Sequence, residues 1–93
     1  MEGFTSFEWD AANVGHVLRH GVLPKEVEEA ANRRHVIIPA RTVDGEERSR
    51  LYGKTAANRY LAVVFTIRER RFRAVTAYDM NLRERRCYAP QID

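Results

Sequence analysis

The sequence predicts a single α+β domain over residues 1–93: a small, mostly antiparallel β-sheet, two N-terminal helices packed on it, and a short C-terminal helix. Apolar residues recur at helical spacing mainly in the first third of the chain. Strand-like runs with period-two alternation fill most of the remainder. A chain of 93 residues also has room for only one hydrophobic core.

Both N-terminal helices are predicted before residue 35. Asp10 is a good N-cap for the first helix, and Gly21 suits the left-handed position after its last turn. Between them, apolar residues recur at helical spacing: Ala11, Val14, Val17 and Leu18. Pro24 suits the first turn of the second helix, and the glutamates that follow favour the positive end of its dipole. The apolar stripe of this helix is narrow: Val27, Ala30 and Ala31.

Four strand-like segments follow the helices. They are HVIIP (35–39), RSRLYGK (48–54), YLAVVFTI (60–67) and RFRAVTAY (71–78). A polar loop with an Asp-Gly turn signal separates the first two segments, and a few charged residues join the last two into an antiparallel hairpin. Asn81 and Glu84 resemble a capping box that starts a helix over 81–89, which Pro90 is expected to end.

Alternation along the strands predicts which side chains share a face. The most apolar face, expected in the core, is Leu61, Val63, Phe65 and Ile67. If the milder faces of the strands align, one arginine-bearing concavity contains Arg48, Arg50, Tyr52, Thr66, Thr76 and Tyr78. The same alternation groups Phe72 and Ala74 with Thr76 and Tyr78, and places Arg73 on the opposite face unless a bulge shifts the register.

The net charge of +3 is unevenly distributed along the chain. Up to Glu46, five basic residues face eight acidic ones; from Glu47 onward, eleven basic residues face five acidic ones, so the halves carry −3 and +6. Arginine outnumbers lysine by fourteen to two, and a guanidinium binds phosphate or carboxylate through two parallel hydrogen bonds. This charge favours RNA, DNA or an acidic protein surface as the partner, although an arginine-rich source proteome would give the same count.

Cysteine usage and hydropathy exclude several classes of protein. The lone Cys87 cannot form an internal disulfide, and no Cys/His set has the spacing of a structural zinc site. No apolar run approaches the ~20 residues of a membrane span, and the acidic opening MEGFTSFEWD differs from a signal peptide. We therefore expect a cytoplasmic protein that is stabilised by packing.

Four blocks of the sequence, in order, resemble the BrnT toxins of bacterial type II toxin–antitoxin systems. The blocks are FEWDAANVGHVLRHGV (7–22), GEERSRLYG (45–53), RYLAVVFTI (59–67) and RAVTAYDMNLRERRCY (73–88). The resemblance implies a RelE-like fold and a metal-independent ribonuclease that needs no cofactor and arrests growth by degrading RNA. It also implies a small antitoxin partner of the BrnA type, which covers the toxin and binds operator DNA in the complex.

The resemblance also implies where the active surface lies. The catalytic candidates are Arg48, Arg73, Thr76 and Tyr78, with His20 and Glu47 nearby. Together with the strand alternation and the charge, the resemblance gives these candidates for RNA binding: Arg50, Tyr52, Arg83, Arg86 and Tyr88. Three positions depart from the family pattern: Asn13 where Lys is frequent, His16 where Asn is common, and Tyr78 where Arg is usual.

Several of these residues also have a purely structural interpretation. His20 suits the negative end of the first helix, Glu47 and Arg48 can form an ion pair at a strand edge, and Thr76 is a β-branched strand residue. Trp9 is better explained as a core anchor than as a stacking platform for a base, whereas Tyr88 suits either stacking on a base or covering the final helix. The Arg83–Arg86 cluster fits either a solvated face or a contact surface.

Metal-free RNA cleavage requires groups that align the 2′-hydroxyl, remove its proton, stabilise charge on the phosphoryl oxygens and protonate the leaving oxygen. Tyr78 lacks the charge of an arginine, but a phenol donates a hydrogen bond, stacks on a base, or transfers a proton if nearby arginines lower its pKa. Two functions therefore stay open: an active endoribonuclease toxin, or a catalytically weakened or inactive relative that binds RNA or the antitoxin and serves autoregulation.

Overall fold

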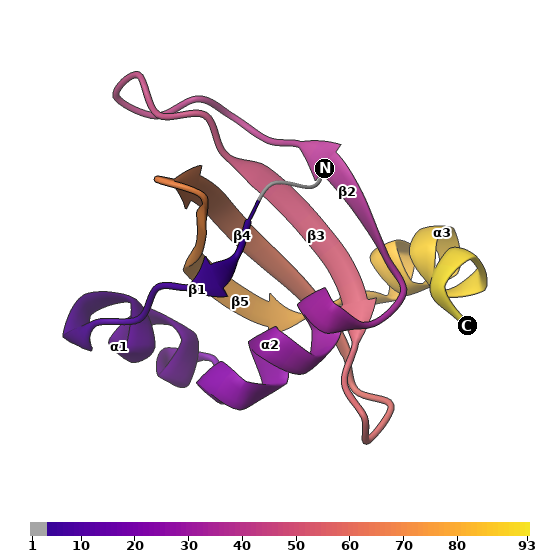
Figure 1. Ribbon diagram of the computed structural model, residues 1–93. Helices are drawn as coiled ribbons and strands as arrows, with labels where there is room; N and C mark the ends of the chain where they lie inside the picture. Colours follow the sequence, from indigo (N-terminus) through magenta and orange to yellow (C-terminus); the bar gives the residue numbers. More distant parts are fainter. Residues whose placement is uncertain (1–3) are drawn as a thin grey trace.

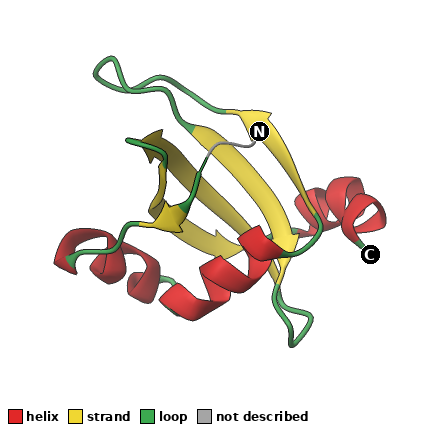
Figure 2. Cartoon of the chain, viewed as in Figure 1, coloured by secondary structure: helices red, strands yellow, loops and turns green. Residues whose placement is uncertain are grey.

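The computed structural model describes residues 4–93, so the first three residues of the acidic opening segment lie outside the described part. It contains three helices and a five-stranded sheet (Figures 1 and 2). The elements are β1 (Ser6–Phe7), α1 (Ala11–Arg19), α2 (Pro24–Asn32), β2 (His35–Pro39), β3 (Ser49–Lys54), β4 (Tyr60–Arg68), β5 (Arg71–Asp79) and α3 (Leu82–Ile92). The predicted α+β class is confirmed.

The strand order of the sheet is β1-β5-β4-β3-β2. Strands β2 to β5 form an antiparallel meander, which confirms the hairpin predicted between β4 and β5. The two-residue strand β1 was not predicted from the sequence, and it pairs parallel with only Arg71 and Phe72. Most of the outer edge of β5 is therefore left without a neighbouring strand. Helix α1 lies along this edge (Figure 1).

Both N-terminal helices begin where the sequence predicts. The Asp10 side chain accepts hydrogen bonds from the backbone N–H groups of Ala12 and Asn13, and Gly21 has a positive φ of 72° after the end of α1. Pro24 occupies the first turn of α2. No helix within residues 4–93 is both long enough and apolar enough to cross a membrane.

The predicted end of the last helix is wrong. Helix α3 continues through Pro90 to Ile92, although the ring removes the hydrogen bond that an N–H at position 90 would donate to the carbonyl of residue 86. Tertiary contacts hold this turn in place: Ile92 is buried, and the Asp93 carboxylate accepts hydrogen bonds from Lys54 Nζ at 2.9 Å and Tyr60 Oη at 2.7 Å. The sequence pattern contains no signal for these long-range contacts.

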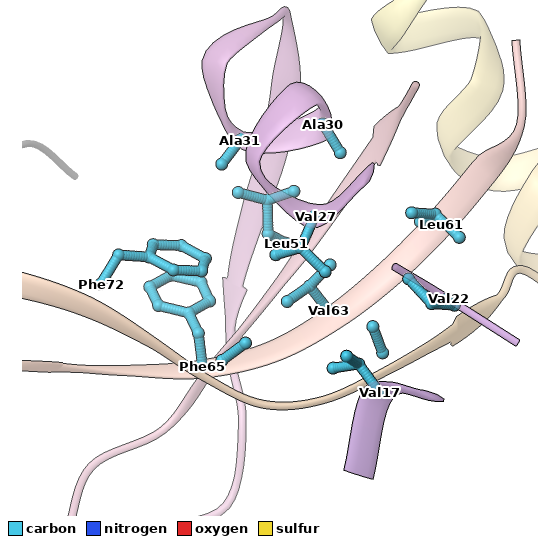
Figure 3. Close-up of a cluster of buried hydrophobic side chains, with 12 residues drawn as sticks. Val17, Val22, Val27, Ala30, Ala31, Leu51, Leu61, Val63, Phe65 and Phe72 are labelled. Carbon is cyan, nitrogen blue, oxygen red and sulfur yellow. The ribbon is translucent and has the colours of Figure 1, made fainter. Parts of the chain in front are cut away.

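Two hydrophobic clusters lie on opposite faces of the sheet. The larger one is covered by α1 and α2, and its aromatic centre is Phe65 stacked on Phe72, with ring centroids 4.3 Å apart (Figure 3). The smaller one lies under α3, where Tyr52, Ala62 and Ile92 are buried. As predicted, Leu61, Val63 and Phe65 are in the larger cluster. Ile67, by contrast, is 37% exposed near the end of β4.

Polar contacts attach the N-terminal helices to each other and to the sheet. Trp9 packs against the larger cluster, as predicted, and its Nε1 donates a hydrogen bond to Glu28 at 2.8 Å. Arg59, just before β4, binds both carboxylate oxygens of Asp79 at 2.7 and 3.0 Å. The same guanidinium contacts Glu26 on α2 and the carbonyl of Gly21. Arg59 thus joins the α1–α2 corner to the end of β5.

Two glycines provide a matched test of the packing between α2 and the sheet. A Cβ at Gly53 would lie 2.9 Å from the carbonyl oxygen of Ala30, whereas a Cβ at Gly15 in α1 would meet nothing within 4 Å. We expect Gly53→Ala to lower the free energy of unfolding by about 1–3 kcal/mol through overpacking. Gly15→Ala should raise it by about 0.5–1 kcal/mol through helix propensity. Urea denaturation measures both, and equal effects would contradict the close approach of β3 to α2.

The Arg59–Asp79 pair predicts a specific acid dependence. The Arg59 guanidinium holds the pKa of the Asp79 carboxyl below its usual range. A carboxylate with a lowered folded-state pKa stabilises the fold above its ordinary value of about 3.9, and this contribution is lost as the pH falls through the folded-state pKa. In Arg59→Gln the free energy of unfolding should therefore fall less steeply between about pH 5 and 3 than in the wild type. The exposed Arg83, changed to Gln, is the control, and identical slopes for the two variants would refute the assignment.

Candidate functional site

A β-bulge in β5 determines which side chains face outward beside α1. Thr76 pairs with Val64, but Ala74 rather than Val75 pairs with Phe65, so Val75 is the extra residue. Ala74 and Phe72 consequently enter the larger hydrophobic cluster. The prediction that they share a face with Thr76 and Tyr78 is wrong, because the alternation was counted without the bulge.

The same bulge reverses the predicted placement of Arg73. Arg73 pairs with Thr66, Thr76 with Val64, and Tyr78 with Ala62. These three partners alternate along β4, on the face opposite Phe65. The residues of β5 that the sequence assigned to two faces therefore share one, which we call the open face.

Asn13 holds α1 against the bulge. Its buried side-chain amide donates hydrogen bonds to the carbonyls of Ala74 at 3.0 Å and Glu8 at 2.9 Å. The amide oxygen accepts a bond from the N–H of Asp10, which closes the capping box of α1. Because every polar atom of this side chain is bonded, the N-terminal half of α1 is fixed beside the open face.

Three arginines meet beside this half of α1 in a cleft of about 210 Å³, which we call the arginine cleft. Its wall includes Arg48 from the loop before β3, Arg68 at the end of β4 and Arg73 on β5. The other lining residues are Ala12, Asn13, His16, Glu46, Ala74 and Val75. Residues from four separate segments thus concentrate positive charge in one small cavity.

Each arginine of the cleft has an acidic partner. Glu46 accepts hydrogen bonds from Arg68 at 2.8 Å and Arg48 at 3.4 Å, and Asp10 accepts one from Arg73 at 2.8 Å. Hydrogen bonding to Arg68 lowers the pKa of Glu46, and hydrogen bonding to Arg73 lowers the pKa of Asp10. Both carboxylates therefore stay ionised near neutral pH and orient the guanidinium groups.

A second cavity adjoins the arginine cleft through Arg48, which lines both. This cavity of about 250 Å³ lies beside the loop between β2 and β3, and Arg41 and Arg50 also line it. Val43 and Val64 supply its apolar surface. The turn of the loop forms at the predicted Asp-Gly pair, where both residues have positive φ. The cavity thus combines flat cationic groups with apolar surface, a combination that suits a nucleobase.

Helix α3 covers the part of this face that carries Tyr52 and Tyr78. Tyr52 is buried and stacks on Tyr88, with ring centroids 3.9 Å apart, and the hydroxyls of Tyr52 and Tyr78 both donate to Glu84. Burial raises the pKa of Tyr52 to about 12. Burial, with the charge of Glu84 as a lesser cause, also raises the pKa of Tyr78. The condition under which Tyr78 would transfer a proton, a pKa lowered by nearby arginines, is therefore not met, because helix α3 buries the phenol.

The remaining candidates fall outside the arginine cleft. His20 is exposed at the far end of α1, about 15 Å from Asp10 at the usual helical rise. The exposed Glu47 uses its carbonyl to accept a hydrogen bond from Thr66, while Arg48 pairs with Glu46 instead. Tyr88 lies on α3 and packs this helix onto the sheet by stacking on Tyr52 of β3. Thr76 is half-buried on the open face, and Arg83 and Arg86 are exposed on α3. A guanidinium nitrogen of Arg50 donates a long hydrogen bond of 3.5 Å to the hydroxyl of Tyr52.

Sequence reasoning did not assign a role in the site to three residues of this region: Glu46, Arg68 and His16. The spacing of Asn13 and His16, one helical turn apart, was the available signal for His16. Glu46 and Arg68 belong to a loop and a strand end that approach each other only in the folded sheet. Within residues 4–93, no three acidic, histidine or cysteine side chains gather in a geometry suited to a metal ion.

Comparison with protein-family models identifies the chain over residues 9–84. The matching model is BrnT_toxin, described as the ribonuclease toxin, BrnT, of a type II toxin–antitoxin system. The chain belongs to the BrnT family. As a BrnT toxin it is a ribonuclease, and a type II system pairs it with an antitoxin. Comparison with curated proteins gave no match.

The position of Tyr78 leads to a prediction for this BrnT chain. Its hydroxyl bonds to Glu84 beneath α3, at 3.2 Å, and its raised pKa keeps the phenol protonated. We expect Tyr78→Phe to retain RNA cleavage and to lower the free energy of unfolding by about 0.5–1.5 kcal/mol, the value of one hydrogen bond. Tyr52→Phe, which removes the other donor to Glu84, is the matched control. A large loss of cleavage in Tyr78→Phe alone would make the phenol catalytic.

Proposed function

We propose that the arginine cleft is the active site of the toxin and that it cleaves RNA without a metal ion, by attack of the 2′-hydroxyl on the adjacent phosphorus. The observation that carries this proposal is the convergence of Arg48, Arg68 and Arg73 on one cavity of about 210 Å³. Guanidinium groups bind phosphate through paired hydrogen bonds and stabilise the charge that develops on its oxygens. The ribonuclease description of the family supports RNA as the substrate.

Each arginine has a role suited to its position. Arg73 is only 16% exposed and is fixed by Asp10, so it is preorganised to hold a phosphoryl oxygen at the wall of the cleft. Arg48 lies between the cleft and the second cavity, so it can contact the phosphate while the neighbouring base enters that cavity. Arg68 is more exposed, so it can contact the phosphates of the RNA backbone as the strand enters. Thr76 lies on the same face and is a candidate hydrogen-bond donor to that backbone.

We propose a BrnA-like antitoxin as the partner, with operator DNA bound only by the complex. The type II family supports an antitoxin, and the ten arginines among the eleven basic residues after Glu46 favour an acidic segment in the covering protein. We place the toxin in the cytoplasm, where both RNA and a newly made antitoxin are found. The exposed Arg83 and Arg86 of α3 extend the positive surface and are proposed to contact RNA outside the cleft.

One observation favours the alternative of a weakened enzyme that binds RNA or antitoxin and serves autoregulation. Where the resemblance gives an arginine, position 78 carries a neutral phenol that points to Glu84 beneath α3. A missing charge-stabilising donor costs about 10²–10³ in rate in comparable sites. The two functions differ in whether the chain alone cuts RNA.

Induction of the chain without its antitoxin tests the proposal. We expect growth arrest and RNA fragments that carry 2′,3′-cyclic phosphate ends. The rate at which the purified toxin cleaves RNA should not change when a chelator is added. Arg48→Ala should lower the cleavage rate by about 10²–10³, because it removes a charge-stabilising donor. The matched control is Arg34→Ala, an exposed arginine beyond the end of α2. Unimpaired growth and intact RNA at high expression would instead favour the non-catalytic alternative.

A further inference from the structure

We propose that His16 is the general base of this toxin, accepting the proton of the 2′-hydroxyl as that oxygen attacks phosphorus. The inference rests on the proposed function, because it assigns a role within the arginine cleft. Sequence reasoning gave position 16 only as a departure from a family in which asparagine is common. An asparagine side chain cannot accept a proton at neutral pH, so this chain carries a chemical group at position 16 that the usual residue lacks.

The fold places the imidazole in the cleft. Asn13 fixes α1 against the bulge of β5, and His16 follows one turn later, on the side of the helix that faces Arg48 and Arg73. The side chain is exposed and accessible to an RNA strand. It makes no hydrogen bond or ion pair with any residue in the range 4–93, so its ring nitrogens are free to bind substrate.

The charged groups around His16 leave it as the best proton acceptor. The groups that face it are Arg48, Arg68, Arg73 and Glu46, with Asp10 on its own helix. Arginines stay protonated and cannot accept a proton. The carboxylates of Glu46 and Asp10 are held by arginines that lower their pKa, which makes them weak bases. A neutral imidazole, by contrast, has a ring nitrogen with a free lone pair that can accept a proton.

The step balances without any further reactant. The 2′-oxygen forms a bond to phosphorus while its proton passes to the neutral imidazole, and the bond from phosphorus to the 5′-oxygen breaks. The 5′-oxygen takes a proton from water, which leaves a 2′,3′-cyclic phosphate and a 5′-hydroxyl. The imidazolium then returns its proton to solvent. The nearby arginines bind the phosphoryl oxygens and stabilise the charge that develops on them.

Cleavage of a short oligoribonucleotide by the purified toxin tests the assignment. Because a general base acts in its unprotonated form, the wild-type rate should rise with pH and level off once the base has lost its proton. His16→Asn keeps a polar side chain of similar shape, and we expect it to lower kcat by about 10²–10⁴ with little change in KM and to abolish this rise. His35→Asn is the matched control, since His35 lies on β2 at the opposite edge of the sheet. It should behave as the wild type does.

A substrate with sulfur in place of the 5′-bridging oxygen separates a base from an acid. A thiolate leaves without a proton, so the defect of His16→Asn should persist with this substrate if His16 acts on the 2′-hydroxyl. Rescue by the sulfur substrate would overturn the base assignment. Equal rates and pH profiles for His16→Asn and the wild type would overturn any catalytic role for His16 while leaving the ribonuclease proposal intact. A wild type that leaves RNA uncut would overturn both.

Discussion

The bulge at Val75 and the Asn13 amide that holds it determine the arrangement of the whole site. The amide bonds the carbonyl of Ala74 where the outer edge of β5 has no neighbouring strand, and it closes the cap of α1 at the same time. A buried carbonyl without a partner costs about 1–3 kcal/mol, so the strand and the helix stabilise each other. The shifted register then sends Phe72 and Ala74 into the core and Arg73 to the open face. Without this shift, Arg73 would face α1 and α2, away from Thr76 and Tyr78.

Helix α3 divides the open face into two regions with different chemistry. Beneath the helix, Tyr52, Tyr78 and Glu84 form a hydrogen-bonded group in which burial keeps both phenols protonated. Beyond it, beside the loop between β2 and β3, the arginines remain accessible. Packing of the C-terminal helix therefore decides which polar residues are structural and which can meet RNA. The carboxylate of Asp93 contributes to this packing through Lys54 and Tyr60.

Acidic partners keep the arginine cleft ordered in the absence of substrate. Like charges that are brought together in a small cavity repel one another, and Glu46 and Asp10 offset this repulsion by pairing with the arginines. A bound RNA phosphate has to compete with these carboxylates, which favours phosphates that fit the cleft closely. The acidic first half of the chain supplies both of these carboxylates, while the basic second half supplies all three arginines. The acidic and basic parts of the sequence are thus brought together as ion pairs in the cleft.

The sequence by itself determined the α+β class, the starts of all three helices, four of the five strands and the concentration of arginine after residue 46, because these depend on local caps, turns and alternation. The resemblance of four sequence blocks to the BrnT toxins pointed to the family. Tertiary structure decided the rest of the site. One extra residue in β5 inverted the predicted placement of Arg73, and burial beneath α3 raised the pKa of Tyr78, whose role the sequence had left open. The contact of Arg68 with Glu46, and the position of His16 beside them, depend on where segments far apart in the chain meet, which alternation within a single strand or helix does not encode.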